Sequence, residues 1–152
     1  VDLDGLPKAR KRRLSSMWKL TEDRYFVGSY ARHLRAALEP YARNLICTVR
    51  RKDCIPHALL VLDDAGVGIV QIGHADFNHW VLAVGIGGVS RRNGLKPACM
   101  MILDPSHAPI PFTPWNAMLS VKADTQDLHA YDTTDGRCRV TVDTILALRH
   151  KA

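Results

Sequence analysis

This sequence lacks long hydrophobic runs, paired cysteines and abundant aromatic residues. No apolar run approaches the roughly 18 residues of a membrane span, and no apolar segment follows the basic N-terminus as in a signal peptide. The four cysteines, Cys47, Cys54, Cys99 and Cys138, show neither metal-ligand spacing nor a dense disulfide pattern. We therefore expect no membrane segment, and free thiols in a reducing, cytoplasmic compartment.

What is present fits one soluble globular domain over residues 1–152. The chain has 152 residues, of which 47% are hydrophobic and 24% charged, and that length allows a sizeable core. It opens with Val1 rather than Met, as a fragment or a processed product would.

The net charge of +6 is unevenly distributed along the chain. Residues 1–52 hold 13 of the 21 Lys and Arg residues but 5 of the 15 Asp and Glu residues. The run Lys8–Arg13 falls in residues 1–20, which Gly5 and Pro7 mark as irregular. We expect a solvated basic arm. Contact with nucleic-acid phosphates or an acidic partner is the less favoured alternative, because no stacking aromatics or recognition motif accompany the run.

Hydrophobic periodicity and turn residues predict an α+β order of elements. They indicate helices over 30–38 and 55–65, a short strand over 45–49, and strands over 68–72, 80–86, 99–103 and 115–121. A hairpin of 128–131 and 137–142 and a helical turn over 144–148, capped by Asp143, follow. The expected fold is an N-terminal helical part packed on a mostly antiparallel sheet of about four to six strands.

The stretch from His74 to Pro105 holds the candidate site. It contains two buried strands joined by a Gly-rich excursion, with His79 at the entry and Asp104 at the exit. If the strands pair as a hairpin, both residues lie at one end of the sheet. An imidazole beside a carboxylate is the pairing of a catalytic base with the residue that orients it. His74 and Asp76 lack a matched distant ligand, so we expect no metal and no cofactor.

The same region resembles the papain-like cysteine peptidases of the C39 type. The segments that carry the resemblance are Gly68–Ile72 (GIVQI), His79–Gly85 (HWVLAVG) and Ile102–Pro105 (ILDP), in that order. It covers about residues 55–110. The resemblance implies a papain-like fold with the site at one end of the sheet. It also implies that His79 is the catalytic base and that Asp104 orients it.

The nucleophile is the part of that pattern that the sequence leaves open. The family places its cysteine at the N-terminus of a central helix, in a Cys-Gly type motif, and residues 1–50 contain no such motif. Three explanations remain: a nucleophile that precedes Val1, a non-catalytic relative, or another cysteine. Cys54 is the candidate for the last, because it stands at a predicted helix N-terminus beside Arg50, where a thiol has a lowered pKa.

The resulting functional hypothesis is a cysteine peptidase-like protein. It would hydrolyse a peptide or amide bond in a peptide or protein substrate, through a Cys54, His79 and Asp104 site. The alternative is a catalytically inactive papain-like binding protein, whose basic arm contacts an acidic or nucleic-acid partner. The sequence does not choose between them and does not indicate an oligomeric state.

Overall fold

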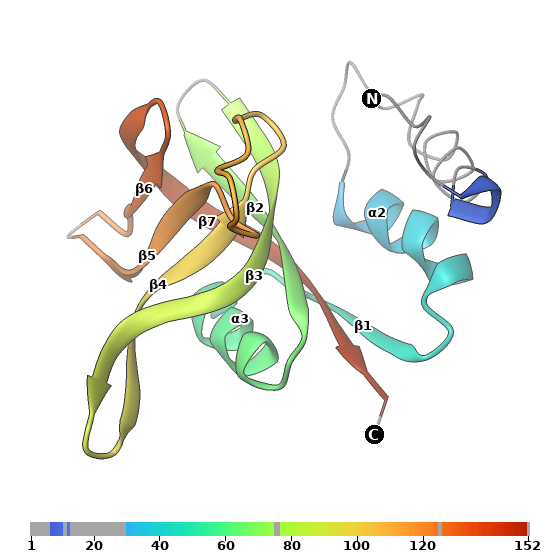
Figure 1. Ribbon diagram of the computed structural model, residues 1–152, viewed down its shortest axis with the longest axis horizontal. Coiled ribbons are helices and arrows are strands. Elements are labelled where there is room, and N and C mark those ends of the chain that lie inside the picture. Colours follow the sequence, from blue (N-terminus) through green and yellow to red (C-terminus); the bar gives the residue numbers. More distant parts are fainter. Residues whose placement is uncertain (1–6, 11, 13–29, 75–76, 125, 152) are drawn as a thin grey trace. The chain divides into compact units, whose positions relative to one another are not determined.

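Figure 1 shows the computed structural model of the protein, which describes residues 7–10, 12, 30–74, 77–124 and 126–151. The chain forms two compact units, Val1–Arg43 and Asn44–Ala152, and each is described by itself. The prediction of one domain over residues 1–152 stays a prediction. Most of the basic arm predicted over residues 1–20 lies outside the described residues. None of the described helices is long and apolar enough to cross a membrane.

The first unit contains the helix α2, Ala31–Leu38, followed by the 3₁₀ turn η2, Glu39–Tyr41. The sequence ARHLRAAL favours a helix because alanine, leucine and arginine have high helix propensity. At its start, the backbone N–H of Tyr30 donates to Nδ1 of His33 at 3.2 Å. Pro40 lies in the turn that ends the helix. The helix predicted over 30–38 is confirmed.

The second unit is built from seven strands and the helix α3, Cys54–Asp63. The strands are β1 (Leu45–Arg50), β2 (Val67–His74), β3 (Phe77–Arg91), β4 (Gly94–Leu103), β5 (Ala117–Ala123), β6 (His129–Thr133) and β7 (Gly136–His150). Every neighbouring pair is antiparallel, in the order β1-β7-β2-β3-β4-β5-β6, and β6 also pairs with β7. That last pairing closes β2 to β7 into a six-stranded barrel, with β1 added to its outside.

The predicted fold class, a papain-like α+β protein with an N-terminal helical part packed on a mostly antiparallel sheet of about four to six strands, is therefore wrong: the sheet is a closed barrel with one extra strand. The physical reason lies in the helical turn predicted over Thr144–Leu148, which is part of β7 instead. All five of these residues are buried, and β7 pairs there with both β2 and β1. Earlier in the same strand, Gly136–Val140 pair with β6. One 15-residue strand thus spans both edges of the sheet and closes it.

The barrel interior is the hydrophobic core, and α3 extends it. Fully or nearly fully buried apolar side chains come from all six barrel strands: Val70, Ile72, Val81, Met100, Ile102, Leu119, Tyr131, Val140 and Ile145. The helix α3 packs against β2, β3 and β7 (Figure 1) and adds Ile55, Ala58 and Val61 to the same cluster. The predicted strands and the hairpin of β6 and β7 are confirmed, although β3 and β7 run much longer than predicted.

Candidate functional site

His79 and Asp104 meet at one end of the barrel. His79 is the third residue of β3, and Asp104 follows directly after β4, its antiparallel partner. On β2, the residue opposite His79 is Ile72, which is fully buried. Because cross-strand partners share a face of the sheet, His79 faces the interior at the barrel mouth. Its Nε2 lies 2.8 Å from Oδ1 of Asp104, so the structure brings together the pair that the sequence placed at one end.

Asp104 is a buried carboxylate with both oxygens hydrogen-bonded. It is 1% exposed. Oδ1 accepts from the backbone N–H of Ser106 at 2.8 Å as well as from His79, and Oδ2 accepts from the Tyr131 hydroxyl at 2.6 Å. Burial on its own would raise the pKa of Asp104, but the hydrogen bonds from Tyr131, His79 and Ser106 outweigh it and hold the pKa below its ordinary value. The carboxylate is ionised at neutral pH.

Asn116 fixes the backbone on which this carboxylate stands. Its Oδ1 accepts from the Asp104 N–H at 2.7 Å, while its Nδ2 donates to the carbonyl oxygens of Asp104 at 2.8 Å and His107 at 2.9 Å. Asn116 is 2% exposed, and no buried polar side-chain atom among the described residues lacks a partner. Such a fully satisfied buried network holds Asp104 in one position.

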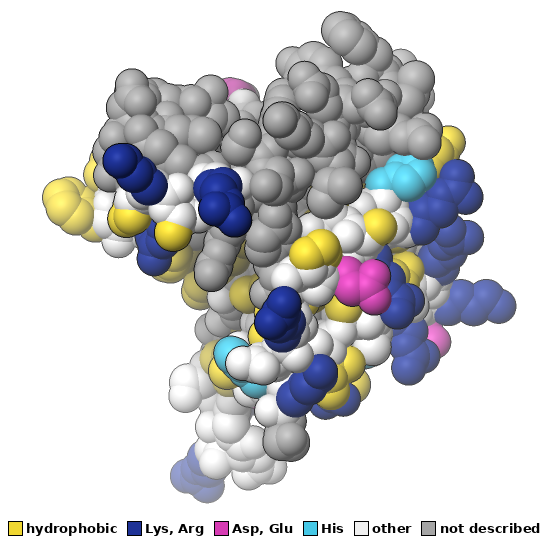
Figure 2. All heavy atoms as spheres, turned by 90° about the vertical axis from the view of Figure 1, so that its right-hand side faces the viewer, with side chains coloured by type: hydrophobic (Ala, Val, Ile, Leu, Met, Phe, Trp, Pro, Cys, Tyr) yellow, Lys and Arg dark blue, Asp and Glu magenta, His cyan; other side chains and the backbone are white. Residues whose placement is uncertain are grey.

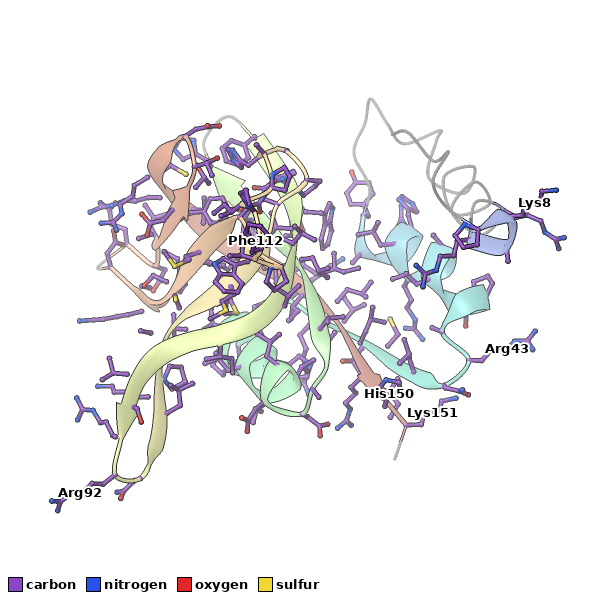
Figure 3. The ribbon with its side chains drawn as sticks, in the orientation of Figure 1. Lys8, Arg43, Arg92, Phe112, His150 and Lys151 are labelled. Atoms are coloured by element: carbon purple, nitrogen blue, oxygen red, sulfur yellow. The ribbon has the colours of Figure 1, made fainter. Side chains whose placement is uncertain are left out.

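The loop between β4 and β5 also presents an aromatic side chain to solvent. Phe112 is fully exposed (Figure 3) and adopts a φ of 64°, in the left-handed region that aromatic residues rarely occupy. The segment that supplies Ser106 and His107 to the site therefore carries a local backbone strain.

The hydrogen bonds of His79 decide which ring nitrogen is available for chemistry. The carboxylate of Asp104 accepts the Nε2 proton, so the neutral ring carries its lone pair on Nδ1. Among the described residues, nothing hydrogen-bonds Nδ1, and the side chain is 26% exposed. The Ser106 hydroxyl lies 3.2 Å from Nε2, the same nitrogen that binds Asp104. Ser106 is therefore not placed as the nucleophile of a Ser-His-Asp relay, in which serine and aspartate bind opposite nitrogens.

A pocket of about 520 Å³ opens beside the pair. Ile72 and Tyr131 contribute to its walls together with His79 and Asp104, and Cys138 of β7 lines it as well. At its rim, Nδ1 of His107 lies 2.9 Å from a carboxylate oxygen of Asp135. That contact ties the loop after β4 to the turn between β6 and β7.

The structure does not place Cys54 in this pocket. Cys54 is 6% exposed within the core cluster, and its thiol donates to the Arg50 carbonyl oxygen over 3.6 Å. Burial, with the charges of Asp143 and Asp53, raises the pKa of this thiol despite a hydrogen bond from the backbone of Ile145. The lowered thiol pKa predicted from the helix N-terminus is wrong, because burial is the largest influence on this thiol and disfavours its ionised form.

Sequence reasoning missed three residues that the barrel brings to the site: Asn116, Tyr131 and Cys138. Cys138 lies opposite Tyr131 in the β6–β7 pair. It is half-buried, and burial followed by the charge of Asp132 raises its pKa. For Cys138 the sequence did contain a signal. Side chains alternate between the two faces of a strand, so Cys138 shares a face with the apolar Val140, two residues further along the predicted hairpin. For Asn116 the sequence offered no comparable signal.

No metal site is found in the part of the chain that the structure describes, where no group of three or more His, Cys, Asp or Glu side chains could hold an ion. His74 stacks on Phe77 with ring centroids 5.5 Å apart. Asp76 lies outside the described residues.

Comparison with known proteins gives no relative for this chain: no protein-family model matches it, and neither a curated protein nor a solved structure does. The resemblance to the C39-type peptidases is therefore untested. What the site itself defines is a buried carboxylate that orients a histidine at the edge of a pocket.

Proposed function

We propose that the barrel mouth is a site for hydrolysing a peptide or amide bond through a thiol nucleophile. The observation that carries the proposal is the hydrogen bond from Nε2 of His79 to the buried Asp104, which leaves Nδ1 without a described partner beside the pocket. A histidine held by a carboxylate on one nitrogen is oriented to move a proton with the other.

The reaction that fits this geometry has two stages. In the first, Nδ1 of His79 takes the thiol proton as the sulfur attacks the carbonyl carbon, and the carbonyl electron pair moves to oxygen. The amine then leaves with the proton that Nδ1 returns to it, and a thioester remains. In the second, His79 takes a proton from water, which attacks the thioester and releases the acid and the thiol. Asp104, ionised at neutral pH, stabilises the imidazolium in both stages.

The cysteine that best fits this role is Cys138. Of the four cysteines, all of which the structure describes, it is the one that lines the pocket with His79. Its raised pKa means that the thiol is protonated at neutral pH. A base is then needed to activate it, and that is the function proposed for His79. Cys54, the nucleophile predicted from sequence, remains a hypothesis that the same experiment tests.

One observation favours a second function, a binding protein that does not catalyse. The pKa values of Cys54 and Cys138 are both raised, so neither thiol is pre-ionised as the reactive cysteines of many enzymes are. In that case the pocket would hold an extended peptide, and His79 and Asp104 would contribute hydrogen bonds instead of chemistry.

The test is amine release from a panel of fluorogenic peptide amides. We expect His79→Ala to lower the rate by about 10²–10⁴-fold, the usual contribution of a general base, and Cys138→Ala to abolish it. Cys54→Ala should keep the rate if it folds, as circular dichroism will show. The exposed His150, on the C-terminal part of β7 (Figure 3), provides the matched control His150→Ala, which should behave as wild type.

Three results would overturn the proposal or part of it. An equal rate in wild type and His79→Ala would rule out the general base. Activity in Cys138→Ala but not in folded Cys54→Ala would move the nucleophile to Cys54. No turnover on any peptide, with peptide binding that His79→Ala weakens, would establish the binding function.

A further inference from the structure

The hairpin of β3 and β4 extends beyond the barrel as a two-stranded arm, residues 88–97. In the described part of the chain, β2 pairs with β3 no further than Ala83, and β5 pairs with β4 no earlier than Cys99. From the pair Gly88–Pro97 to the pair Arg91–Gly94, each strand therefore has a neighbour on one side, which is its partner in the hairpin. Figure 1 shows this ribbon leaving the barrel, and its tip lies at the opposite end of β3 from His79.

The arm is cationic and carries no acidic residue. Arg91, Arg92 and Lys96 are exposed, and the sequence from 77 to 103 contains no Asp or Glu. Arg92 points outward from the tip of the ribbon in Figure 3. Lys and Arg side chains are also more frequent than Asp and Glu on the face drawn in Figure 2, but on the arm their charge is not offset by any acidic neighbour in the strand pair.

Two large aliphatic side chains are exposed on the same arm. Val89 is 60% exposed and Leu95 is 52% exposed. They stand on adjacent pairs of the ladder, Val89 opposite Lys96 and Leu95 opposite Ser90, so they lie on opposite faces of the ribbon, and Val89 shares its face with Lys96 and Arg91. Cationic and apolar groups together on a projecting ribbon suit a partner that offers both phosphates and apolar base edges.

The root of the arm sets its direction. The register between β3 and β4 shifts between Gly87 and Gly88, and a Cβ atom on Gly88 would lie 2.2 Å from the Lys96 carbonyl oxygen. Glycine is thus required at position 88, because any side chain there would collide with the backbone of the partner strand. Such an irregularity bends and twists a strand pair, so the arm has a fixed bend where it leaves the barrel.

We propose that this arm binds double-helical DNA by entering the major groove. A two-stranded ribbon fits that groove, which is about 12 Å wide and about 8.5 Å deep. From Gly88 to Arg91 the arm advances by three residue steps, or about 10 Å at a rise of about 3.3 Å per residue. With the face that carries Val89, Lys96 and Arg91 turned toward the DNA, Val89 contacts thymine methyl groups. The long side chains of Arg91, Arg92 and Lys96 contact phosphates. This inference goes beyond the proposed hydrolysis and does not depend on it.

The test is fluorescence anisotropy of the whole chain with a labelled 25-base-pair DNA duplex over a salt series. The arm variant carries Arg91→Gln, Arg92→Gln and Lys96→Gln. If all three contact phosphates, the slope of log K against log salt falls by up to about 2.7, which is up to about 500-fold in affinity at about 0.1 M salt. We expect at least tenfold. Val89→Ser should weaken binding and leave the salt slope unchanged, whereas Leu95→Ser, on the opposite face of the ribbon, should bind as wild type does.

A control variant removes three positive charges elsewhere in the same unit, through Lys122→Gln, Arg139→Gln and Arg149→Gln. Arg139 and Arg149 already pair with Asp124 and Asp64, so we expect an affinity within about twofold of wild type. Equal losses in the arm and control variants would mean that general charge, and not the arm, holds the DNA.

Other ligands decide the remaining outcomes. Duplex RNA should bind more weakly than DNA, because its major groove is too narrow and deep for side chains to read. Arm-dependent binding to vesicles with 30% phosphatidylserine, without DNA binding, would overturn the proposal in favour of a lipid surface. An arm variant that bound DNA as wild type does and also self-associated would overturn the proposal as well. The charges would then serve only to keep the exposed edges of β3 and β4 from pairing with another molecule.

Discussion

Replacing Tyr131 by phenylalanine is the sharpest test of the network around Asp104. The substitution keeps the ring, which is 3% exposed in the barrel wall, and removes the hydroxyl that donates to Oδ2 of Asp104 at 2.6 Å. After the change, Nε2 of His107 stands 3.7 Å from Oδ2. That is beyond hydrogen-bond distance, so a buried carboxylate oxygen loses its partner.

The expected cost follows from the charge on that oxygen. A hydrogen bond to a charged group contributes about 1.5–3 kcal/mol, and leaving a buried acceptor unpaired costs a similar amount. We expect Tyr131→Phe to lower the free energy of unfolding by about 2 kcal/mol. For a chain of this length, that corresponds to a fall in Tm of about 4–8 °C.

The cost should also depend on pH in a defined way. Burial and the hydrogen bond to Asp104 raise the pKa of Tyr131 above its ordinary value of 10.0. A raised pKa contributes stability below pH 10 that is lost as the pH rises, because the unfolded tyrosine then ionises and the folded one does not. At one pH unit above that value, wild type loses about 1.4 kcal/mol that Tyr131→Phe does not lose. The two stability curves should therefore converge above pH 10.

The assay is urea unfolding, followed by circular dichroism, at several pH values between 5 and 11. Tyr30→Phe is the matched control, since Tyr30 is 58% exposed and a surface change of this kind stays within about 0.5 kcal/mol. The reasoning would be refuted if wild type and Tyr131→Phe differed by less than about 0.5 kcal/mol in the free energy of unfolding at pH 7. It would also be refuted if that difference stayed constant through pH 11.

Three further substitutions test separate parts of the structure. Asn116→Ala removes the buried hydrogen bonds to the Asp104 and His107 backbone, so it should cost about 3 kcal/mol or more in urea unfolding; a loss under 1 kcal/mol would contradict the network. Phe112→Asn should stabilise the chain by about 0.5–1 kcal/mol, because asparagine tolerates the positive φ that strains an aromatic residue; a lower Tm would contradict that. Asp104→Asn should remove part of the acid unfolding between pH 2 and 5, because the lowered pKa of Asp104 gives stability above its ordinary value of 3.8 that is lost as the pH falls; an unchanged acid limb in a Tm titration would show that Asp104 is not linked to folding.

The sequence predicted the part of the site that depends on one hairpin. His79 and Asp104 stand at the same end of one hairpin, at the start of β3 and just after β4, so local pattern was enough to place them together. Tyr131 and Asn116 reach Asp104 from β6 and from the residue before β5. Their contacts depend on how β5 pairs with β4 and β6 with β5, and nothing local in the hairpin of His79 and Asp104 encodes those pairings.

The fold class was missed for one reason, the reading of Thr144–Leu148. A short apolar run does not distinguish a buried strand from a buried helical turn. What decided the outcome was pairing on both sides, to β2 and β1, which tertiary structure provides. The same error hid the barrel, because without the long β7 the first and last strands of the sheet have no common neighbour.

The Tyr131 to Asp104 hydrogen bond joins residues 27 positions apart, across a strand, β5, that must itself be in place. The hydrogen bonds of Asp104 are consequently complete only after β5 has paired with β4 and β6 with β5. Completion of the pocket wall around Asp104 is then a late event, and recovery of the Tyr131 to Asp104 hydrogen bond during refolding should lag behind the recovery of strand content. A chain that has collapsed without pairing β5 to β4 and β6 to β5 would hold Asp104 without the Tyr131 hydroxyl.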